Sequence, residues 1–264
     1  MKCSVIGCGN MAGAVIGGLI AHGVLTPEEI TASDLAPEAR ERLSDRYGIS
    51  TIADNKECVK DADLVLLAVK PNVFPLVAED IRDLVDGKII VSIMAGRTLR
   101  HLEEALGNDK KIIRCMPNTP ALVGAGITGY CPNGNVKAKD LECARMIIEG
   151  FSEAEQIPES LMAVVTSVSG SSPAFIYMLI EAMADGAVAD GMPRKQAYHF
   201  AAQTVLGSAK MVLDTGLHPG ELKDMICSPG GTTIEGVTKL EEKGFRTAMI
   251  EAVRATTAKA KKME

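Results

Sequence analysis

The first residues of the chain carry a motif that strongly constrains its fold. An apolar run over residues 2–6 leads into Gly7-Cys8-Gly9-Asn10-Met11-Ala12, and a helix-like run continues to residue 21. A G-x-G-x-x-A pattern between a strand and a helix is the dinucleotide-binding fingerprint. Gly7 permits the tight turn, Gly9 lets the backbone approach a pyrophosphate, and Ala12 allows close helix packing. A strand–helix turn without a ligand is the alternative, and the place of the motif on the first strand favours the nucleotide.

The second predicted strand, residues 30–33, ends at Asp34, 22 positions after Ala12. An acid at this spacing typically accepts hydroxyls of the adenosine ribose and repels a 2′-phosphate. Asp34 alone therefore favours NAD over NADP. Arg40 and Arg42 follow closely, and each could pair with Asp34, reach a phosphate or line a solvated helix face. We expect the solvated face for both arginines.

Three further apolar runs predict buried strands of a parallel sheet, at residues 63–69, 89–93 and 112–115. Ligands of doubly wound sheets bind at the carboxyl ends of the strands. Residues at these ends should therefore border the cofactor, namely Ala68, Val69, Lys70 and Pro71, and then Ala95 and Gly96. Lys70 could contact ribose or nicotinamide, or it could be a surface lysine. Asn118 and Thr119, between two prolines, form a stiff loop after the last run.

Composition excludes several classes of function. The net charge of −6 and the aromatic content of 3%, with no Trp, argue against a nucleic-acid partner. The seven cysteines include no C-x-x-C pair, so we expect reduced thiols in a cytoplasmic protein, and no metal site is visible. No signal peptide is apparent, and the apolar segment 174–189, interrupted by Glu181 and Asp185, is too short for a bilayer span. We therefore expect no membrane partner.

Beyond residue 157 the pattern becomes helical. Helices are predicted from Pro173 to about residue 190, from Pro193 to about residue 216, after Ser228, and over residues 245–261. We expect a Rossmann domain with a doubly wound parallel sheet at 1–157 and an all-helical domain at 158–264. The two central helices are apolar on more than one face, and about 100 residues cannot bury them. This predicts an obligate dimer, with the helical domain forming the contact.

A small, hydroxyl-rich stretch opens one of these helices: Ser228-Pro229-Gly230-Gly231-Thr232-Thr233. Paired glycines turn backbone N–H groups toward a ligand, and the helix dipole favours negative charge there. An ordinary capped helix start is the alternative. Together with the fingerprint, the stretch favours a small carboxylate held beside a dinucleotide. Residues 169–172, including Ser171, are predicted at another helix N-terminus, where they could line the same cleft or cap the helix.

These motifs, together with Ala68-Val69-Lys70-Pro71, Met116-Pro117-Asn118-Thr119-Pro120 and residues 170–174 and 218–224, occur in this order and spacing in pyrroline-5-carboxylate reductases, which the whole chain resembles. The resemblance implies reduction of 1-pyrroline-5-carboxylate to L-proline with NADPH or NADH, and a dimer that often assembles into decamers. It also implies that the substrate carboxylate lies on Ser228–Thr233, held by Ser228 and the backbone of Gly231, Thr232 and Thr233. The Thr233 hydroxyl would face the ring nitrogen, and Asn55 would contact the adenosine end of the cofactor.

One residue departs from the family pattern. The family usually prefers NADPH, but Asp34 stands where a small hydroxyl residue would better suit the 2′-phosphate, so cofactor preference stays open. Two alternatives also stay open. A 3-hydroxyacid dehydrogenase or imine reductase relative usually has a lysine acid on its interdomain helix, and residues 171–190 contain none. A dinucleotide sensor without turnover would not need the carboxylate-binding stretch.

Overall fold

The computed structural model describes residues 1–264, and the chain divides into two compact units. The first unit contains residues 1–170 together with residues 256–264, and the second contains residues 171–255. The sequence suggested a boundary after residue 157. By their contacts, residues 158–170 and the end of the chain belong to the first unit. The first unit is therefore built from two separate stretches of sequence.

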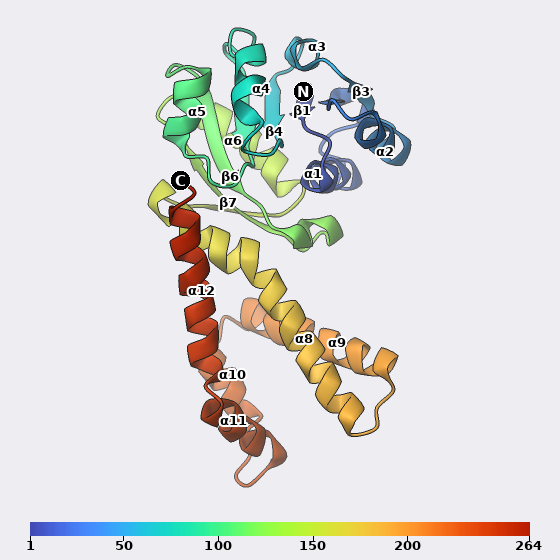
Figure 1. Ribbon diagram of the computed structural model, residues 1–264, viewed down its shortest axis with the longest axis vertical. Helices are drawn as coiled ribbons and strands as arrows, with labels where there is room; N and C mark the ends of the chain where they lie inside the picture. Colours follow the sequence, from blue (N-terminus) through green and yellow to red (C-terminus); the bar gives the residue numbers. More distant parts are fainter. The chain divides into compact units, whose positions relative to one another are not determined.

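The first unit is built on one sheet of eight strands, in the order β3-β2-β1-β4-β5-β6-β7-β8. Figure 1 shows this sheet with helices around it. The strands are β1 (Cys3–Ile6), β2 (Ile30–Ser33), β3 (Ser50–Ile52), β4 (Leu64–Leu67), β5 (Ile89–Ser92), β6 (Lys111–Met116), β7 (Ile127–Pro132) and β8 (Glu153–Gln156). Neighbouring strands run parallel except β6 and β7, which are antiparallel. The order reverses at β1, which lies between β2 and β4. This reversal is the switch point at which doubly wound sheets bind dinucleotides.

Helices accompany the sheet in the first unit. They are α1 (Asn10–Ala21), α2 (Pro37–Tyr47), α3 (Asn55–Val59), α4 (Phe74–Ile81), α5 (Leu99–Leu106), α6 (Ala138–Glu149) and α7 (Met162–Val165), with short 3₁₀ turns at Pro27–Glu29, Thr119–Val123 and Glu159–Leu161. The predicted first helix and the predicted strands at residues 30–33, 63–69, 89–93 and 112–115 are confirmed, with bounds differing by at most a few residues.

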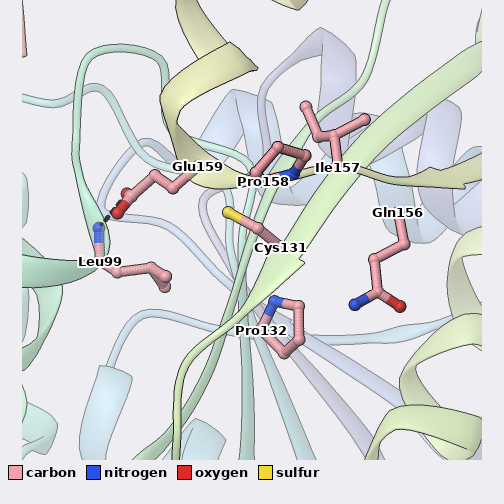
Figure 2. Close-up of a pocket in the computed structure, with 7 residues that line it drawn as sticks. All are labelled: Leu99, Cys131, Pro132, Gln156, Ile157, Pro158 and Glu159. Atoms are coloured by element: carbon pink, nitrogen blue, oxygen red, sulfur yellow. Dashed lines mark hydrogen bonds between the residues drawn. The ribbon is translucent and has the colours of Figure 1, made fainter.

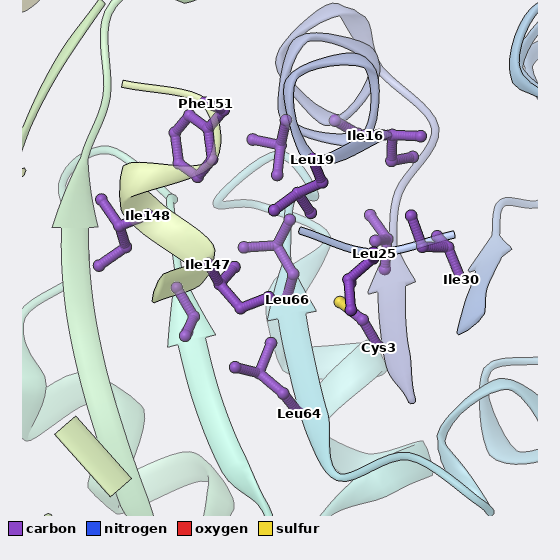
Figure 3. Close-up of a cluster of buried hydrophobic side chains, with 14 of the residues drawn as sticks. Cys3, Ile16, Leu19, Leu25, Ile30, Leu64, Leu66, Ile147, Ile148 and Phe151 are labelled. Atoms are coloured by element: carbon purple, nitrogen blue, oxygen red, sulfur yellow. The ribbon is translucent and has the colours of Figure 1, made fainter. Parts of the chain in front are cut away.

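The sheet separates two apolar cores because successive residues of a strand point to opposite faces. Leu64 and Leu66 of β4 belong to one core, whereas Val65 and Leu67 belong to the other. In the first core, Ile16 and Leu19 of α1 and Ile147 of α6 lie over the strands (Figure 3). With apolar side chains on both faces, the central strands appear in the sequence as continuous apolar runs.

Three strands of the sheet, β3, β7 and β8, were not predicted from the sequence. The sequence predicted a doubly wound parallel sheet, and the antiparallel pairing of β7 with β6 is an addition to that prediction. Its sequence, Ile-Thr-Gly-Tyr-Cys-Pro, mixes polar residues, glycine and proline, and lacks the apolar run that identifies a buried strand. β3 has only three residues, and β8 (Glu-Ala-Glu-Gln) is polar and largely exposed. Their strand conformation comes from pairing with neighbours in the sheet rather than from local sequence pattern.

The second unit is entirely helical. It contains α8 (Ser172–Ala189), α9 (Arg194–Thr215), α10 (Pro219–Met225), α11 (Thr232–Glu242) and most of α12 (Phe245–Lys261), whose last residues belong to the first unit. Its buried residues are Ala184, Ala197 and Ala201, at the pairing of α8 with α9. Small side chains allow these two helices to approach closely. The larger apolar side chains of the unit stay mostly exposed in the single chain.

The helix that enters the second unit begins earlier than predicted. Residues Glu159–Ala189 form one helical stretch, with a π-helical segment at Thr166–Ser171 directly before Pro173. Ser171 and its neighbours therefore lie inside a helix, and the predicted N-terminus at residues 169–172 is wrong. A π-helical segment shifts the bonding pattern of a helix, which suits proline because it has no backbone N–H. By length and composition this helix could cross a membrane, a property shared by core helices of soluble proteins.

Candidate functional site

The fingerprint turn contains two glycines with different roles. Gly7 has φ of 103°, and a Cβ built there would lie 2.7 Å from the Ala68 carbonyl oxygen. Gly7 is therefore required by the turn and by its packing against the end of β4. Gly9 precedes α1 without a side-chain cap, and no atom of the chain lies within 4 Å of a built Cβ. There is space for a ligand above Gly9, and no side chain caps the N–H groups in the first turn of α1, which include those of Asn10 and Met11. Both features suit a pyrophosphate.

Asp34 follows β2 and is fixed by the fingerprint turn. One carboxylate oxygen accepts a hydrogen bond from the Cys8 backbone N–H at 2.8 Å, and the other accepts one from Ala36 at 2.9 Å. A carboxylate offers about four acceptor positions, so two remain for ribose hydroxyls. Asp34 is thus held firmly in the position expected of a ribose-binding acid.

Arg42 is exposed on α2, as expected, whereas Arg40 is half-buried, which corrects the expectation for Arg40. Both arginines also form backbone hydrogen bonds beside the fingerprint turn. Arg40 donates a hydrogen bond to the Asp34 carbonyl at 2.6 Å, and Arg42 donates one to the Cys8 carbonyl, also at 2.6 Å. Neither forms an ion pair with a carboxylate. Two guanidinium groups therefore lie beside the fingerprint turn, close to Asp34.

Asn55 begins α3, whose N-terminus is capped by the Asp54 side chain. Its side-chain oxygen accepts a hydrogen bond from the Ser33 hydroxyl at 2.8 Å, and its amide group approaches Asp80 at 3.5 Å. Ser33 is the last residue of β2 and directly precedes Asp34. The structure therefore brings Asn55 to the same strand end as Asp34, on the β2 side of the switch point.

The loops after β4 and β5 lie on the other side of β1. Ala68, Val69 and Pro71 are half-buried and Lys70 is exposed. In the next loop, Ala95 is half-buried, and Gly96 has φ of 71° and lies against Met263 near the end of the chain. The two loops are joined by Arg97, which donates a hydrogen bond to the Pro71 carbonyl at 2.6 Å. Sequence reasoning missed Arg97.

The glycine-rich stretch before α11 has the predicted form of a helix N-terminus. Gly231 is the residue before the helix, and no side chain caps the N–H groups of Thr232, Thr233 and the residue that follows. Gly230 has φ of 67°, and the Gly231 backbone N–H donates to the Ser228 carbonyl at 3.0 Å. A Cβ built on Gly231 would clash with the Ser228 hydroxyl, which therefore lies directly beside the helix N-terminus. The Ser228 hydroxyl and the N–H groups of Thr232 and Thr233 can donate hydrogen bonds to a carboxylate.

Comparison with known proteins finds relatives that match along the whole chain. Pyrroline-5-carboxylate reductase of Escherichia coli (strain K12) is 52% identical over 263 residues, which cover 99% of this chain and 98% of that protein. The chain belongs to the pyrroline-5-carboxylate reductase family. The homologue of Methanosarcina acetivorans is 45% identical over 99% of this chain and 97% of its own length.

Family models and a solved structure agree with this membership. A model described as pyrroline-5-carboxylate reductase dimerisation matches residues 159–263, and one described as NADP oxidoreductase coenzyme F420-dependent matches residues 2–96. The crystal structure of Plasmodium falciparum pyrroline carboxylate reductase with NADP bound superposes with a TM-score of 0.91. It is 31% identical and covers 100% of this chain and 98% of its own. The expected fold, a Rossmann unit followed by a helical dimerisation domain, is confirmed.

One pocket of this reductase contains none of the predicted site residues (Figure 2). Its volume is about 410 Å³, and it lies where the N-terminus of α5 meets the ends of β7 and β8. Burial raises the pKa of its Cys131 to about 12, so the thiol stays protonated. The Glu159 carboxylate accepts hydrogen bonds from the Leu99 backbone N–H and from Arg114, at 2.6 and 2.9 Å. Its two ionisable side chains are thus a neutral thiol and a carboxylate engaged in structural bonds.

Proposed function

We propose that this chain reduces 1-pyrroline-5-carboxylate to L-proline by hydride transfer from NAD(P)H, the last step of proline synthesis. The observation that carries the proposal is the full-length match to the reductase family, in a chain that has both a nucleotide turn and an uncapped anion-binding helix N-terminus. The residues present fit a dinucleotide: Gly9 leaves space above the turn, Asp34 keeps acceptor positions for ribose, and Asn55 lies beside it.

The substrate carboxylate is held by the Ser228 hydroxyl and the backbone N–H groups of Thr232 and Thr233. These donors lie at the positive end of the α11 dipole, and they fix the ring through a group that does not react. The Gly231 N–H, which the sequence also suggested as a donor, is engaged by the Ser228 carbonyl. Ser171 stays a candidate for contact with the substrate from inside its helix. Lys223 pairs with Asp224, which supports a structural role for that lysine.

Hydride transfer to the imine does not require a strong acid or base from the protein. When bound, the reduced nicotinamide supplies a hydride, and a protonated cyclic imine is already a good hydride acceptor. The chain's contribution is positioning, because near-attack geometry requires the reacting atoms to lie about 3–3.5 Å apart. The Thr233 hydroxyl donates to, or relays a proton at, the ring nitrogen.

The reductase acts as a homodimer in the cytoplasm, with decamers as the larger assembly and no nucleic-acid or membrane partner. The dimerisation model over residues 159–263 and the exposed apolar side chains of the second unit support the dimer. Light scattering on the purified protein distinguishes a dimer from a decamer. A monomer at micromolar concentration would contradict both.

The test of function is oxidation of NADPH and of NADH in the presence of 1-pyrroline-5-carboxylate. Wild-type protein is expected to oxidise at least one nucleotide, and proline is expected to accumulate in equal amount. A folded protein that binds nucleotide without turnover would contradict the proposal and favour a sensor.

The same assay tests cofactor preference in Asp34→Ser. Removing the carboxylate removes its repulsion of a 2′-phosphate, and Arg40 and Arg42 remain nearby. We expect the ratio of kcat/KM for NADPH over NADH to rise about tenfold or more. An unchanged ratio would show that Asp34 does not set the preference.

A further inference from the structure

Arg97 connects the two loops that follow β4 and β5. These strands are parallel neighbours, so their carboxyl ends lie side by side. Asp34 and Asn55 lie on the β2 side of the switch point, which places the adenosine there. The loops after β4 and β5, on the opposite side of β1, therefore border the nicotinamide half of a dinucleotide.

The environment of Arg97 is unusual for an arginine of this chain. Its guanidinium donates to the Pro71 carbonyl at 2.6 Å and forms no ion pair with a carboxylate. Its Nε is buried, and no group of the chain accepts a hydrogen bond from it. Buried donors without an acceptor are rare, and each asks for an explanation. This arginine is not explained by neutralisation of a nearby acid.

The loop that carries Arg97 is fixed by contacts on its far side. Gly96 lies against the backbone and side chain of Met263, which would be 3.1–3.2 Å from a built Cβ. The Leu99 backbone N–H donates to Glu159, and Arg114 pairs with both Glu159 and Glu264. A firmly held residue 97 can therefore determine where the Lys70–Pro71 backbone lies.

We propose that Arg97 is a cofactor-positioning residue, which holds the Lys70–Pro71 backbone against the Ala95–Gly96 loop so that the nicotinamide half of the dinucleotide is bound in one orientation. The inference rests on the proposed function only in taking the ligand to be a nicotinamide dinucleotide. It adds a residue that lies in none of the recognised motifs.

The test compares a whole dinucleotide with a fragment that lacks nicotinamide. Calorimetry would measure the Kd of NADP⁺ and NAD⁺, and of ADP-ribose and its 2′-phosphate, for wild type, Arg97→Met and Arg97→Lys. Arg100→Met is the matched control, because Arg100 lies three residues on, is exposed and pairs with Glu104. We expect Arg97→Met to weaken dinucleotide binding about tenfold, the value of one hydrogen bond to a charged donor. Binding of the fragments should be unchanged.

Arg97→Lys keeps the charge and one donor, so it should recover part of the loss. Equal losses for dinucleotide and fragment would overturn the proposal, as would full affinity in Arg97→Met. If Arg97→Met does not fold, the same dinucleotide-to-fragment comparison on Arg97→Lys decides the matter. In turnover, the KM for the dinucleotide should rise and the KM for the imine should stay unchanged. Absence of wild-type turnover would refute the proposed function. The comparison of dinucleotide and fragment binding would still test whether Arg97 positions the nicotinamide half.

Discussion

The two units of this chain differ in how far they bury their large apolar side chains. In the first unit the sheet buries side chains on both faces, and residues such as Leu64, Leu66 and Ile90 have no exposed surface. In the second unit three alanines are buried, while Met178, Leu213 and Met225 are 68–74% exposed. The first unit buries most of its apolar side chains within itself. The second unit needs a further surface to cover the apolar side chains that it leaves exposed. For the second unit, the match to a dimerisation model supports the proposal that another copy of the chain supplies that surface.

A single charge placed at equally exposed apolar positions of the two units should have different effects on assembly. Met178 on α8 and Leu76 on α4 are both 68% exposed. We expect Met178→Glu to dissociate the oligomer, because an unpaired carboxylate would be buried in the contact. Leu76→Glu should leave the mass unchanged in light scattering. Intact assembly in Met178→Glu, or dissociation in Leu76→Glu, would contradict the contrast drawn above.

Within the first unit, the two fingerprint glycines separate packing from ligand binding. Gly9→Ala should fold with an unchanged Tm, because a Cβ meets no atom there, yet bind dinucleotide about a hundredfold more weakly since it fills the approach to the pyrophosphate. Gly7→Ala should lower the Tm, because its Cβ would clash with the Ala68 carbonyl. Thermal unfolding and calorimetry on both variants measure this. A destabilised Gly9→Ala would indicate a packing role instead.

In the second unit, Thr233→Val removes a hydroxyl while keeping the shape of the side chain. If that hydroxyl serves the ring nitrogen, kcat should fall about tenfold or more. The dinucleotide Kd should not change, since nucleotide binding belongs to the first unit. Thr233→Ser retains a hydroxyl and serves as the control. Wild-type kcat and KM in Thr233→Val would remove this residue from the mechanism.

The smallest expected effect concerns thiol reactivity. Burial raises the pKa of Cys3, Cys8 and Cys131 to about 12, and it raises those of Cys58 and Cys115 as well. Because the thiolate is the nucleophile, these groups should react very slowly with a thiol reagent at about pH 8. Cys143 and Cys227 are partly exposed and should account for any fast reaction. More than two fast thiols per native chain would show that the first-unit core opens readily.

Much of the first unit was predictable from its sequence because strands buried on both faces appear as apolar runs. β1, β4, β5 and β6 were found in this way, whereas β2 (Ile-Thr-Ala-Ser) was predicted as the strand that ends at Asp34. β7 has no such run, and it could be recognised only from its pairing with β6. Pro173 was taken as a helix beginning, but a π-helical segment lets the helix continue through it. Proline marks a helix start only when no other bonding pattern accommodates its missing N–H.

The candidate site was predictable where a motif is local. The fingerprint turn, Asp34 and the stretch from Ser228 to Thr233 each lie within a few residues, and their shape follows from glycine and from helix ends. Arg97 was not predictable, because its contact with Pro71 joins loops 26 residues apart. Likewise, the backbone contacts of Arg40 and Arg42 depend on how α2 returns to the turn. Such contacts follow from tertiary packing rather than from a sequence pattern.

The return of residues 256–264 to the first unit has a consequence for the order in which the protein is made. Ribosomal synthesis completes the second unit before it adds the segment that supports Gly96 and pairs with Arg114. The sheet and its nucleotide turn can form early on the nascent chain. The loop after β5 acquires this support only after residues 263 and 264 have been synthesised, so it is the last part of the first unit to be completed.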